Sequence, residues 1–222
     1  MNPVLSAQER NAIFQAFRSG DGINLRKLLT EIEKRENISD IGVLNESKAC
    51  NGNTVIHVAA EVGQVDMLIA YFSLCGLRSS EPRLLFEKNN AGDAPIHIAA
   101  KRRRADFVKQ ICKRGEDINR AGANNYTPLH YAVEMQDLHL VMFLMSAPTI
   151  DVNVVTESGD TPLHLAAYND DLKIVRFLMR RGGAIVAIKN CMDQTPFNIA
   201  QYVETYTVYE YFIDCRMLGG SV

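Results

Sequence analysis

The sequence lacks a long hydrophobic run, an export signal and a strong net charge. Its densest apolar stretch, LVMFLM, is far shorter than the roughly 18 residues that a membrane-spanning helix needs. The N-terminal segment MNPVLSAQERN has neither the basic start nor the apolar core of a signal peptide. A formal net charge of -2 gives no long-range attraction to nucleic acid or to an anionic membrane. We therefore expect no membrane partner, and we expect nucleic acid to be a poor one.

Cysteine is scarce and irregularly placed. The five cysteines are an odd number, and no two of them have CxxC spacing. Free thiols of this kind fit a reducing compartment better than a disulfide framework. We expect a cytoplasmic protein, in a host cytosol if it is a secreted effector, with the nucleus as a second location. Because 47% of the residues are hydrophobic, the chain can bury one compact core or one continuous repeat array.

The sequence also lacks the motifs of familiar enzyme chemistry. No HExxH, GxSxG or glycine-rich phosphate loop occurs, and the carboxylates are scattered. Nothing in the spacing places a histidine as a base for Cys75 or Cys112. We therefore expect no catalysis, no cofactor and no metal site. The alternative that stays open is an active site assembled from distant parts of the chain.

What the sequence does contain is one heptapeptide in five copies. The copies are TVIHVAA, APIHIAA, TPLHYAV, TPLHLAA and TPFNIAQ, which begin at Thr54, Ala94, Thr127, Thr161 and Thr195. Successive starts are 40, 33, 34 and 34 residues apart. A period in the low thirties is typical of a solenoid of small helical units, because no such unit can bury its apolar face alone.

The copy that begins at Thr161 shows the local physics of one unit. Thr161 can cap the free amides at a helix start, and Pro162 fits the first turn with its fixed φ. After a polar break, LKIVRFLMRR places apolar residues at helical spacing and ends on basic residues, which the helix dipole favours there. Gly182 and Gly183 are expected to end this second helix. Each unit is therefore predicted to contain two helices and a turn-rich connection.

These features resemble the ankyrin repeat, in which a T-P-L-H-x-A core begins a unit of about 33 residues. The resemblance implies an all-α ankyrin-repeat solenoid of stacked helix-turn-helix units with short hairpin-like finger loops. Residues 45–214 would form five ankyrin repeats, the last of them a C-terminal capping repeat, and 215–222 a C-terminal tail. Residues 1–44 would form an N-terminal helical cap or a degenerate ankyrin unit. Counting that cap, about six helical pairs would form one right-handed stack.

Several positions depart from the family pattern. The glycine that the family places between the two helices survives only as Gly63. The equivalent positions of the other units are Arg103, Gln136, Asp170 and Glu204. We expect these turns to adopt a positive φ or to close differently. The extra residues of the first, longest interval are placed within 75–88, where the junction should bulge or contain an extra turn.

Four histidines occupy the same place in successive units, namely His57, His97, His130 and His164. In a regular stack they lie about one helix diameter, roughly 10 Å, apart. That is too far to share a metal ion, which binds nitrogen at about 2.0 to 2.1 Å. The resemblance implies that each ring instead bonds backbone near its own helix start and ties neighbouring units together. Asn119 and Asn153 resemble the finger asparagines that a cellular asparaginyl hydroxylase accepts in ankyrin arrays.

The resemblance also implies a concave partner surface, made by finger positions and by the exposed ends of the first helices. Because stacking uses the repeated letters, we place function in their unrepeated neighbours. The predicted partner-binding residues are Asp93, Lys101, Arg102, Tyr126, Glu134, Met135, Asp160, Tyr168, Asn169 and Tyr202. The equivalent positions elsewhere are Asn53, Glu61, Val62 and Gln194. Tyrosine and arginine are both enriched at interface hot spots.

The sequence thus predicts a non-enzymatic protein–protein interaction module that acts as a scaffold, inhibitor or adaptor and is monomeric by itself. One alternative with the same fold is a bacterial pathogen effector that engages a host protein. An alternative of another class is an enzyme or phospholigand binder centred on the basic run Lys101–Arg104. The more ordinary interpretation of that run is a solvated loop and helix face.

Overall fold

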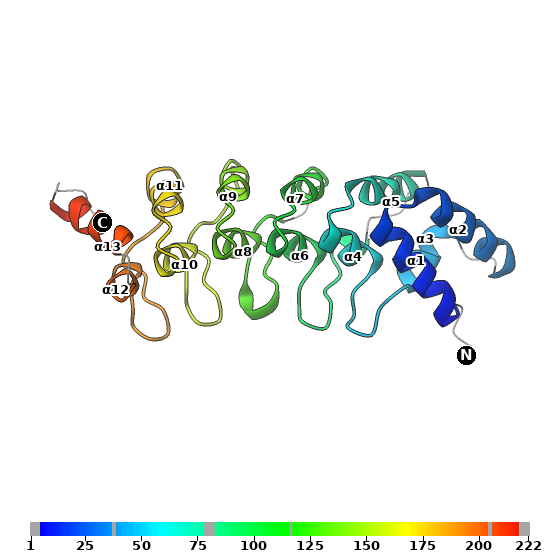
Figure 1. Ribbon diagram of the computed structural model, residues 1–222, viewed down its shortest axis with the longest axis horizontal. Coiled ribbons are helices and arrows are strands. Elements are labelled where there is room, and N and C mark those ends of the chain that lie inside the picture. The colour runs from blue at the N-terminus through cyan, green and yellow to red at the C-terminus, as the bar shows by residue number, and fades with distance from the viewer. Residues whose placement is uncertain (1–4, 37–38, 78–82, 116, 204–205, 218–222) are drawn as a thin grey trace. The chain divides into compact units, whose positions relative to one another are not determined.

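The computed structural model describes residues 5–36, 39–77, 83–115, 117–203 and 206–217 (Figure 1). Within these ranges all regular secondary structure is helical, apart from an isolated bridge between Lys48 and Thr54. The predicted all-α fold is therefore confirmed. The chain divides into two compact units, Met1–Glu116 and Asp117–Val222. In the described ranges no helix is both long and apolar enough to cross a bilayer.

The N-terminal unit consists of helices that pack in two rows. Its helices are α1 (Ala7–Ser19), α2 (Gly22–Glu36), α3 (Asp40–Glu46), α4 (Val55–Val62), α5 (Val65–Leu77), the short 3-10 helix η1 (Arg83–Leu85), α6 (Pro95–Lys101) and α7 (Ala105–Cys112). Helix α4 packs between α1 and α6, while α5 packs against α3 and α7. The apolar faces of these helices meet between the rows, where Ile56, Leu68 and Phe107 are fully buried.

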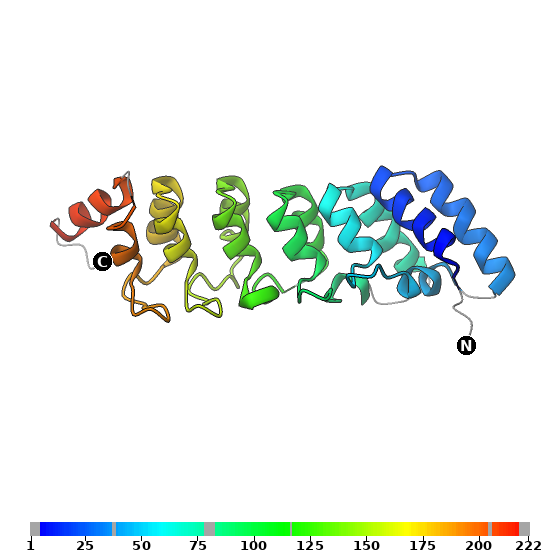
Figure 2. The same cartoon turned by 60° about the horizontal axis from the view of Figure 1, so that its bottom comes forward.

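The C-terminal unit repeats the same arrangement. Its helices are η2 (Ala123–Asn125), α8 (Pro128–Glu134), α9 (Leu138–Leu144), α10 (Pro162–Tyr168), α11 (Leu172–Gly182), α12 (Pro196–Ala200) and α13 (Thr207–Met217). Figures 1 and 2 show the first helices α8, α10 and α12 side by side, with α9 and α11 in a second row. The loops that precede the first helices project away from the second row (Figure 1). This is the predicted stack of helix-turn-helix units with finger loops.

The helix starts follow the predicted capping chemistry. The Thr161 hydroxyl accepts a hydrogen bond from the backbone amide of His164, and Pro162 occupies the first turn. Thr127 caps α8 in the same way. The small-residue face then packs inward, since Ala166 and Ala167 of α10 are fully buried. Local capping and small apolar residues therefore explain why such short helices form here.

Of the two alternatives expected for the turns between paired helices, the structure shows the positive φ. Arg103 has φ 57°, Gln136 φ 53° and Asp170 φ 50°, a left-handed conformation that is unfavourable for non-glycine residues. At Asp170 the side chain offsets this cost, because its carboxylate accepts hydrogen bonds from the first amides of α13, Thr207 at 3.3 Å and Val208 at 2.7 Å. The fourth predicted position, Glu204, lies outside the described residues.

The predicted insertion lengthens a helix and adds a turn. Helix α5 has 13 residues, whereas its counterpart α7 has 8. Beyond it, η1 buries Leu84 and Leu85, and the Leu84 amide donates to the Tyr71 hydroxyl at 3.1 Å. The intervening residues 78–82 lie outside the described ranges.

Both ends of the chain form additional helices. The predicted N-terminal cap contains α1, α2 and most of α3, and Gly20 between α1 and α2 has φ 77°. Arg35 of α2 pairs with Glu9 of α1 at 2.6 Å, and this contact lowers the pKa of the Glu9 carboxyl to about 2. At the other end, the proposed boundary between 214 and 215 falls within α13. The domain boundaries themselves stay predictions, and residues 218–222 lie outside the described part.

The fingers are tight hairpin-like turns that bond to one another. Within one finger, the Thr156 amide donates to the Asp160 carbonyl at 3.0 Å. Within the next finger, the Asn190 amide donates to the Gln194 carbonyl at 2.9 Å. The amide of Cys191 donates to the Ser158 carbonyl at 2.8 Å, which joins the two fingers. Gly159 lies at this junction with φ 79°, and a Cβ atom there would lie 2.8 Å from the Cys191 amide nitrogen. This position therefore requires glycine for two separate reasons.

Gly159→Ala tests the contact between fingers. The control is Gly183→Ala, because Gly183 has φ 66° and no heavy atom lies within 4 Å of the added Cβ. We expect it to lower the free energy of unfolding by about 1 to 2 kcal/mol through its backbone conformation alone. Gly159→Ala should cost at least about 1 kcal/mol more, since its new methyl group meets backbone of the neighbouring finger. Urea unfolding of the two variants measures the difference, and equal losses would contradict the requirement for close approach.

Candidate functional site

The repeated histidines connect each helix start to the following finger. In three units a threonine backbone amide donates to the histidine Nδ1 atom: Thr54 to His57 at 3.1 Å, Thr127 to His130 at 3.1 Å and Thr161 to His164 at 3.0 Å. The amide of Ala94 donates to His97 in the same way, at 3.0 Å. On the opposite side of the ring, Nε2 contacts the carbonyl oxygens of Asp93, Asp160 and Gln194 at 2.9, 3.2 and 3.0 Å in the units of His57, His130 and His164.

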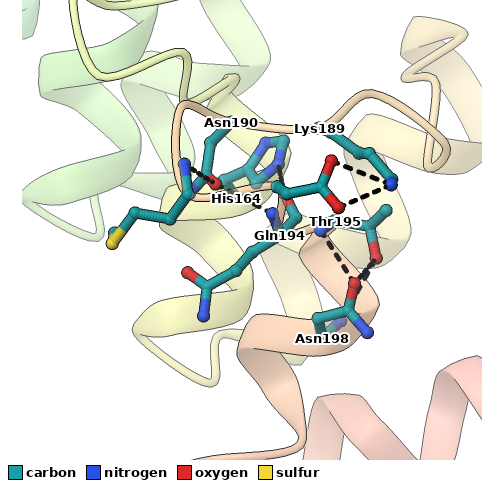
Figure 3. A network of polar contacts seen from close by, with 8 residues as sticks. His164, Lys189, Asn190, Gln194, Thr195 and Asn198 are labelled. Carbon is teal, nitrogen blue, oxygen red and sulfur yellow. Dashed lines mark hydrogen bonds and ion pairs between the residues drawn. The ribbon is translucent and has the colours of Figure 1, made fainter.

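These contacts fix the protonation state of the ring. Because a backbone amide can only donate, Nδ1 must accept and is therefore unprotonated. A carbonyl can only accept, so Nε2 must bear the proton and donate it. Figure 3 shows the contact of His164, whose ring reaches the backbone of Gln194 in the next finger. Each such ring is thus a neutral bridge between two units.

The unit that begins at Thr195 keeps the helix-start contact without a histidine. Asn198 replaces the histidine, and its Oδ1 atom accepts from the Thr195 amide at 3.0 Å and from the Thr195 hydroxyl at 2.8 Å (Figure 3). Asparagine therefore reproduces the helix-start contact of Nδ1 with a shorter side chain. The departure that the sequence displays at this position has a structural reason.

Burial depresses the basicity of the bridging histidines. It lowers the pKa of His57 and His164, and it lowers the pKa of His130 to about 4, in each case against the weaker opposing effect of the backbone carbonyl. A buried ring that uses both nitrogens for backbone contacts is a poor metal ligand. Within the described residues, no group of three or more His, Cys, Asp or Glu side chains is arranged to bind a metal ion.

The finger asparagines form a second set of bridges in the C-terminal unit. Asn119 donates through Nδ2 to the Thr149 carbonyl at 2.7 Å and accepts through Oδ1 from the Asp151 amide at 2.8 Å. Asn153 does the same one unit later, with the Gly183 carbonyl at 3.2 Å and the Ile185 amide at 2.9 Å. Both side-chain amides therefore bind the connection that follows the next second helix.

One groove of 530 Å³ in the C-terminal unit brings together most of the predicted partner-binding residues. Six of them line it, namely Tyr126, Glu134, Asp160, Tyr168, Asn169 and Tyr202. They come from the fingers and first helices of three successive ankyrin-like repeats within the C-terminal unit. The groove therefore exists only because α8, α10 and α12 stack in register (Figure 1). Its volume is within the range of about 300 to 1,000 Å³ that is typical of ligand sites.

The tyrosines of this groove differ in packing and exposure. Tyr168 is 71% exposed and Tyr202 is 77% exposed, although both are large aromatic residues. Tyr126 is half-buried, with its ring centroid 5.0 Å from that of Tyr131 and 5.5 Å from that of His130. Burial raises the pKa of the Tyr126 hydroxyl, and the nearby carboxylates of Glu134 and Asp160 raise it further. Tyr126 is thus held by its neighbours, whereas Tyr168 and Tyr202 face solvent.

Sequence reasoning was wrong about Asp93. We expected it at the partner surface, but its side chain is only 4% exposed. The finger turns inward at this point, because the Asp93 amide bonds to Asn89 Oδ1 at 3.0 Å and the Asp93 carbonyl bonds to His57. Its counterpart Asp160 is less buried and lines the groove described above.

The other predicted residues lie outside this groove. Met135 ends α8 and is half-buried, but it does not line the groove. Lys101 and Arg102 are exposed and belong to the N-terminal unit. There Arg102 pairs with Glu61 at 2.8 Å, and Arg104 donates to the Glu61 carbonyl at 3.4 Å. Part of the basic run therefore bonds to the preceding unit of the array.

Sequence reasoning missed the apolar lining of the groove. Leu165 and Ile199 occupy the x position of T-P-L-H-x-A, and Leu165 lies one helical turn before Tyr168 on the same face. The periodic spacing relative to Tyr168 was the signal that could have identified Leu165. Met192 lines the groove from a finger and is 70% exposed, and no feature of the sequence distinguished it.

The N-terminal unit has a groove of its own, with a volume of 1170 Å³, between α2 and α5. Ile23, Leu29 and Met67 are among its lining residues. None of the residues that the sequence predicted for partner binding lies there. The groove of the C-terminal unit is therefore the candidate site that both the repeat pattern and the geometry indicate.

His130→Asn tests the neutral bridge through its dependence on pH. The pKa of His130 is about 6.5 in the unfolded state and about 4 in the folded state. Between these values the unfolded state binds more protons, so the free energy of unfolding should fall as the pH falls through this window. The loss from His130 alone is about 3 kcal/mol, and this contribution is fully present above pH 6.5. His130→Asn retains an acceptor for Thr127 and should give a shallower pH dependence in urea titrations.

The matched control is His139→Asn, which removes an exposed histidine from α9 of the same unit. We expect its dependence of stability on pH to follow that of the parent protein. An equal change of slope in the two variants would show that the bridging position has no special role.

Comparison with known proteins agrees with this geometry. A family model for ankyrin repeats (3 copies) matches residues 80–156 and 137–217, which together cover more than half of the chain. The human transient receptor potential cation channel subfamily A member 1 is 31% identical over 104 residues, 47% of this chain and 9% of that protein. The I-Kappa-B like protein H1 of Microplitis demolitor bracovirus is 31% identical over 108 residues, 47% of this chain and 55% of that protein.

A third relative is a plant protein. The putative E3 ubiquitin-protein ligase XBAT31 of Arabidopsis thaliana is 28% identical over 142 residues, 64% of this chain and 28% of that protein. The chain thus matches less than two thirds of the length of each of these three relatives. The family match and the stacked helix pairs lead to one conclusion: this chain belongs to the ankyrin-repeat family, whose arrays are in general non-enzymatic modules for protein–protein interaction.

Proposed function

We propose that the groove of the C-terminal unit binds a partner protein, and that the chain acts through this contact as a scaffold, inhibitor or adaptor. The observation on which this rests is the exposure of Tyr168 and Tyr202, 71% and 77%, at the lining of one groove. Tyrosine provides a large contact area at little entropic cost, and it is enriched among the few residues that dominate interface energetics.

The chemistry of the groove supports binding rather than catalysis. Its histidine, His164, uses Nδ1 for its own helix start and Nε2 for the Gln194 carbonyl. Neither nitrogen is therefore placed to abstract a proton from a bound molecule. Asp160 is likewise engaged, since its two carboxylate oxygens accept from Ser158 Oγ and Asn190 Nδ2, both at 2.8 Å. His164 and Asp160 are thus held by hydrogen bonds within the fold, and they contribute a fixed surface to the groove.

The two alternative functions, a pathogen effector and a phospholigand binder, require different binding sites. A bacterial pathogen effector that engages a host protein would use the same groove, so it changes the partner and not the mechanism. A phospholigand site on Lys101–Arg104 would need several cationic groups to converge on one anion. The contacts of Arg102 and Arg104 with Glu61 favour an architectural role for that run. We also propose a cytoplasmic location, because the scattered cysteines fit a reducing compartment, and a monomeric state.

Replacing the exposed tyrosines tests the proposal. We expect Tyr168→Ala and Tyr202→Ala each to weaken binding of the captured partner at least tenfold, since hot-spot truncation removes more than about 1.4 kcal/mol. The midpoint of thermal unfolding should change little, because both side chains are mainly exposed. The measurement is affinity capture from a cell lysate with mass-spectrometric quantification, followed by titration of the purified partner.

The matched control is Met142→Ala. Met142 is 45% exposed on α9, which belongs to the second row of helices, and it does not line the groove. This variant should bind as the parent protein does. Unaltered binding in both tyrosine variants, or equal weakening in the control, would refute the assignment to the groove.

Asn119 and Asn153 are proposed sites of asparaginyl hydroxylation. Their side chains bond at both ends to neighbouring backbone, so an enzyme can reach the Cβ atom only after the finger opens locally. We expect treatment with the cellular hydroxylase to add one oxygen atom per site, detected by intact-mass and fragment analysis. Gly159→Ala, which strains the finger region, should accelerate the reaction at Asn153. No added oxygen in either protein would rule the modification out.

A further inference from the structure

We propose that the partner presents an arginine side chain to the corner of the groove formed by Tyr126, Glu134 and Asp160, next to an aliphatic side chain that packs on Leu165 and Ile199. The occupant is thus a short segment of another protein with an arginine beside a bulky apolar residue. This inference rests on the proposed function and specifies the chemistry of the partner at the same groove.

The charge of the groove is of one sign. Among the described residues that line it, Glu134 and Asp160 are the charged ones, and both are acidic. The remaining lining is apolar, aromatic or amide-bearing. The chain as a whole has a formal net charge of only -2, so this local field does not follow from the overall composition. An anionic site with apolar walls strengthens its interaction with a cation because little water screens it.

The corner is already organised for a cation. The Tyr126 ring is packed against Tyr131 at 5.0 Å and His130 at 5.5 Å, which limits its rotation. The Asp160 carboxylate is fixed by Ser158 and Asn190, yet each of its oxygens can accept a second hydrogen bond. Glu134 is exposed at the end of α8 and lines the same groove, and both carboxylates lie near enough to Tyr126 to raise the pKa of its hydroxyl. An aromatic face and two carboxylates therefore meet where a guanidinium could bind.

The geometry favours arginine over lysine or a small cation. A guanidinium can stack on an aromatic ring while it donates to carboxylates in its own plane, and it is more weakly hydrated than an ammonium group. A free cation would leave Leu165, Ile199 and Tyr168 uncovered, although all three line the groove. A peptide segment can satisfy the acidic corner and cover the apolar floor at the same time. We therefore assign the groove to a segment of a protein.

Selection of displayed peptides tests this assignment. A library of random linear peptides is selected on the full chain, and the enriched peptides are synthesised with their arginine intact or changed to alanine, lysine or glutamate. We expect enrichment of arginine beside Leu, Ile, Val or Met. Replacing the arginine by glutamate should weaken binding at least a hundredfold, and replacing it by lysine should weaken binding several-fold.

The decisive comparison is a double-mutant cycle. Glu134→Gln should weaken binding of the arginine peptide about threefold to tenfold and should leave binding of its alanine version unchanged, which corresponds to an exposed charge pair. Glu157→Gln is the matched control, because Glu157 is an exposed carboxylate on a finger of the same unit and does not line the groove. It should not change the affinity for either peptide. Thermal unfolding of both variants verifies that they fold.

The outcomes separate this inference from the proposed function. Peptides that Tyr168→Ala weakens but that are not enriched in arginine overturn the inference and leave the proposed function intact. An equal effect of Glu134→Gln on the arginine and alanine peptides has the same meaning. Peptides that Tyr168→Ala and Tyr202→Ala both leave unaffected contradict the proposed function as well. Failure to select any peptide from the library counts against both.

Discussion

The neutral imidazole that joins a helix start to the next finger is the interaction on which this array depends. Its Nδ1 atom accepts from a backbone amide of its own unit, and its Nε2 atom donates to a carbonyl one unit later. Both partners are backbone groups that would otherwise be buried without a hydrogen bond, which costs about 1 to 3 kcal/mol each. Because the ring is rigid, it also fixes the distance between a helix and the following finger. The groove of the C-terminal unit inherits its shape from that spacing.

This arrangement separates architecture from recognition within a few residues. In TPLHLAA the threonine, proline, histidine and alanines are buried and serve capping and stacking. The x position, Leu165, and the residue after the motif, Tyr168, lie on the helix face that lines the groove. A substitution at Tyr168 therefore alters the surface of the groove while the fold remains intact. Asp170, in contrast, differs from the glycine of the family pattern but has a structural role, because its carboxylate caps α13.

The sequence alone predicted the features that depend on local physics. The helix pairs and the capping threonines follow from residue type and spacing, and positive φ at Arg103, Gln136 and Asp170 was one of two alternatives that the family pattern offered. Burial of Asp93 could not be predicted, because it depends on the turn of its finger at Asn89 and on the contact with His57 of the preceding repeat. The lining residue Met192 was missed for a similar reason: its place in the groove depends on the finger turn, in which Asp193 has φ 59°. Features that arise only after stacking have no local signature.

The same distinction applies to charge. A net charge near zero argues against a polyanionic or polycationic partner, but it does not describe any single surface. Stacking places Glu134 of one repeat and Asp160 of the next in the lining of one groove, although they are far apart in the sequence. Like charges that converge on one groove repel each other when the groove is empty, and a cationic ligand relieves that repulsion. A few residues that stacking does not require can therefore set the charge of a groove, with no change in the overall composition of the chain.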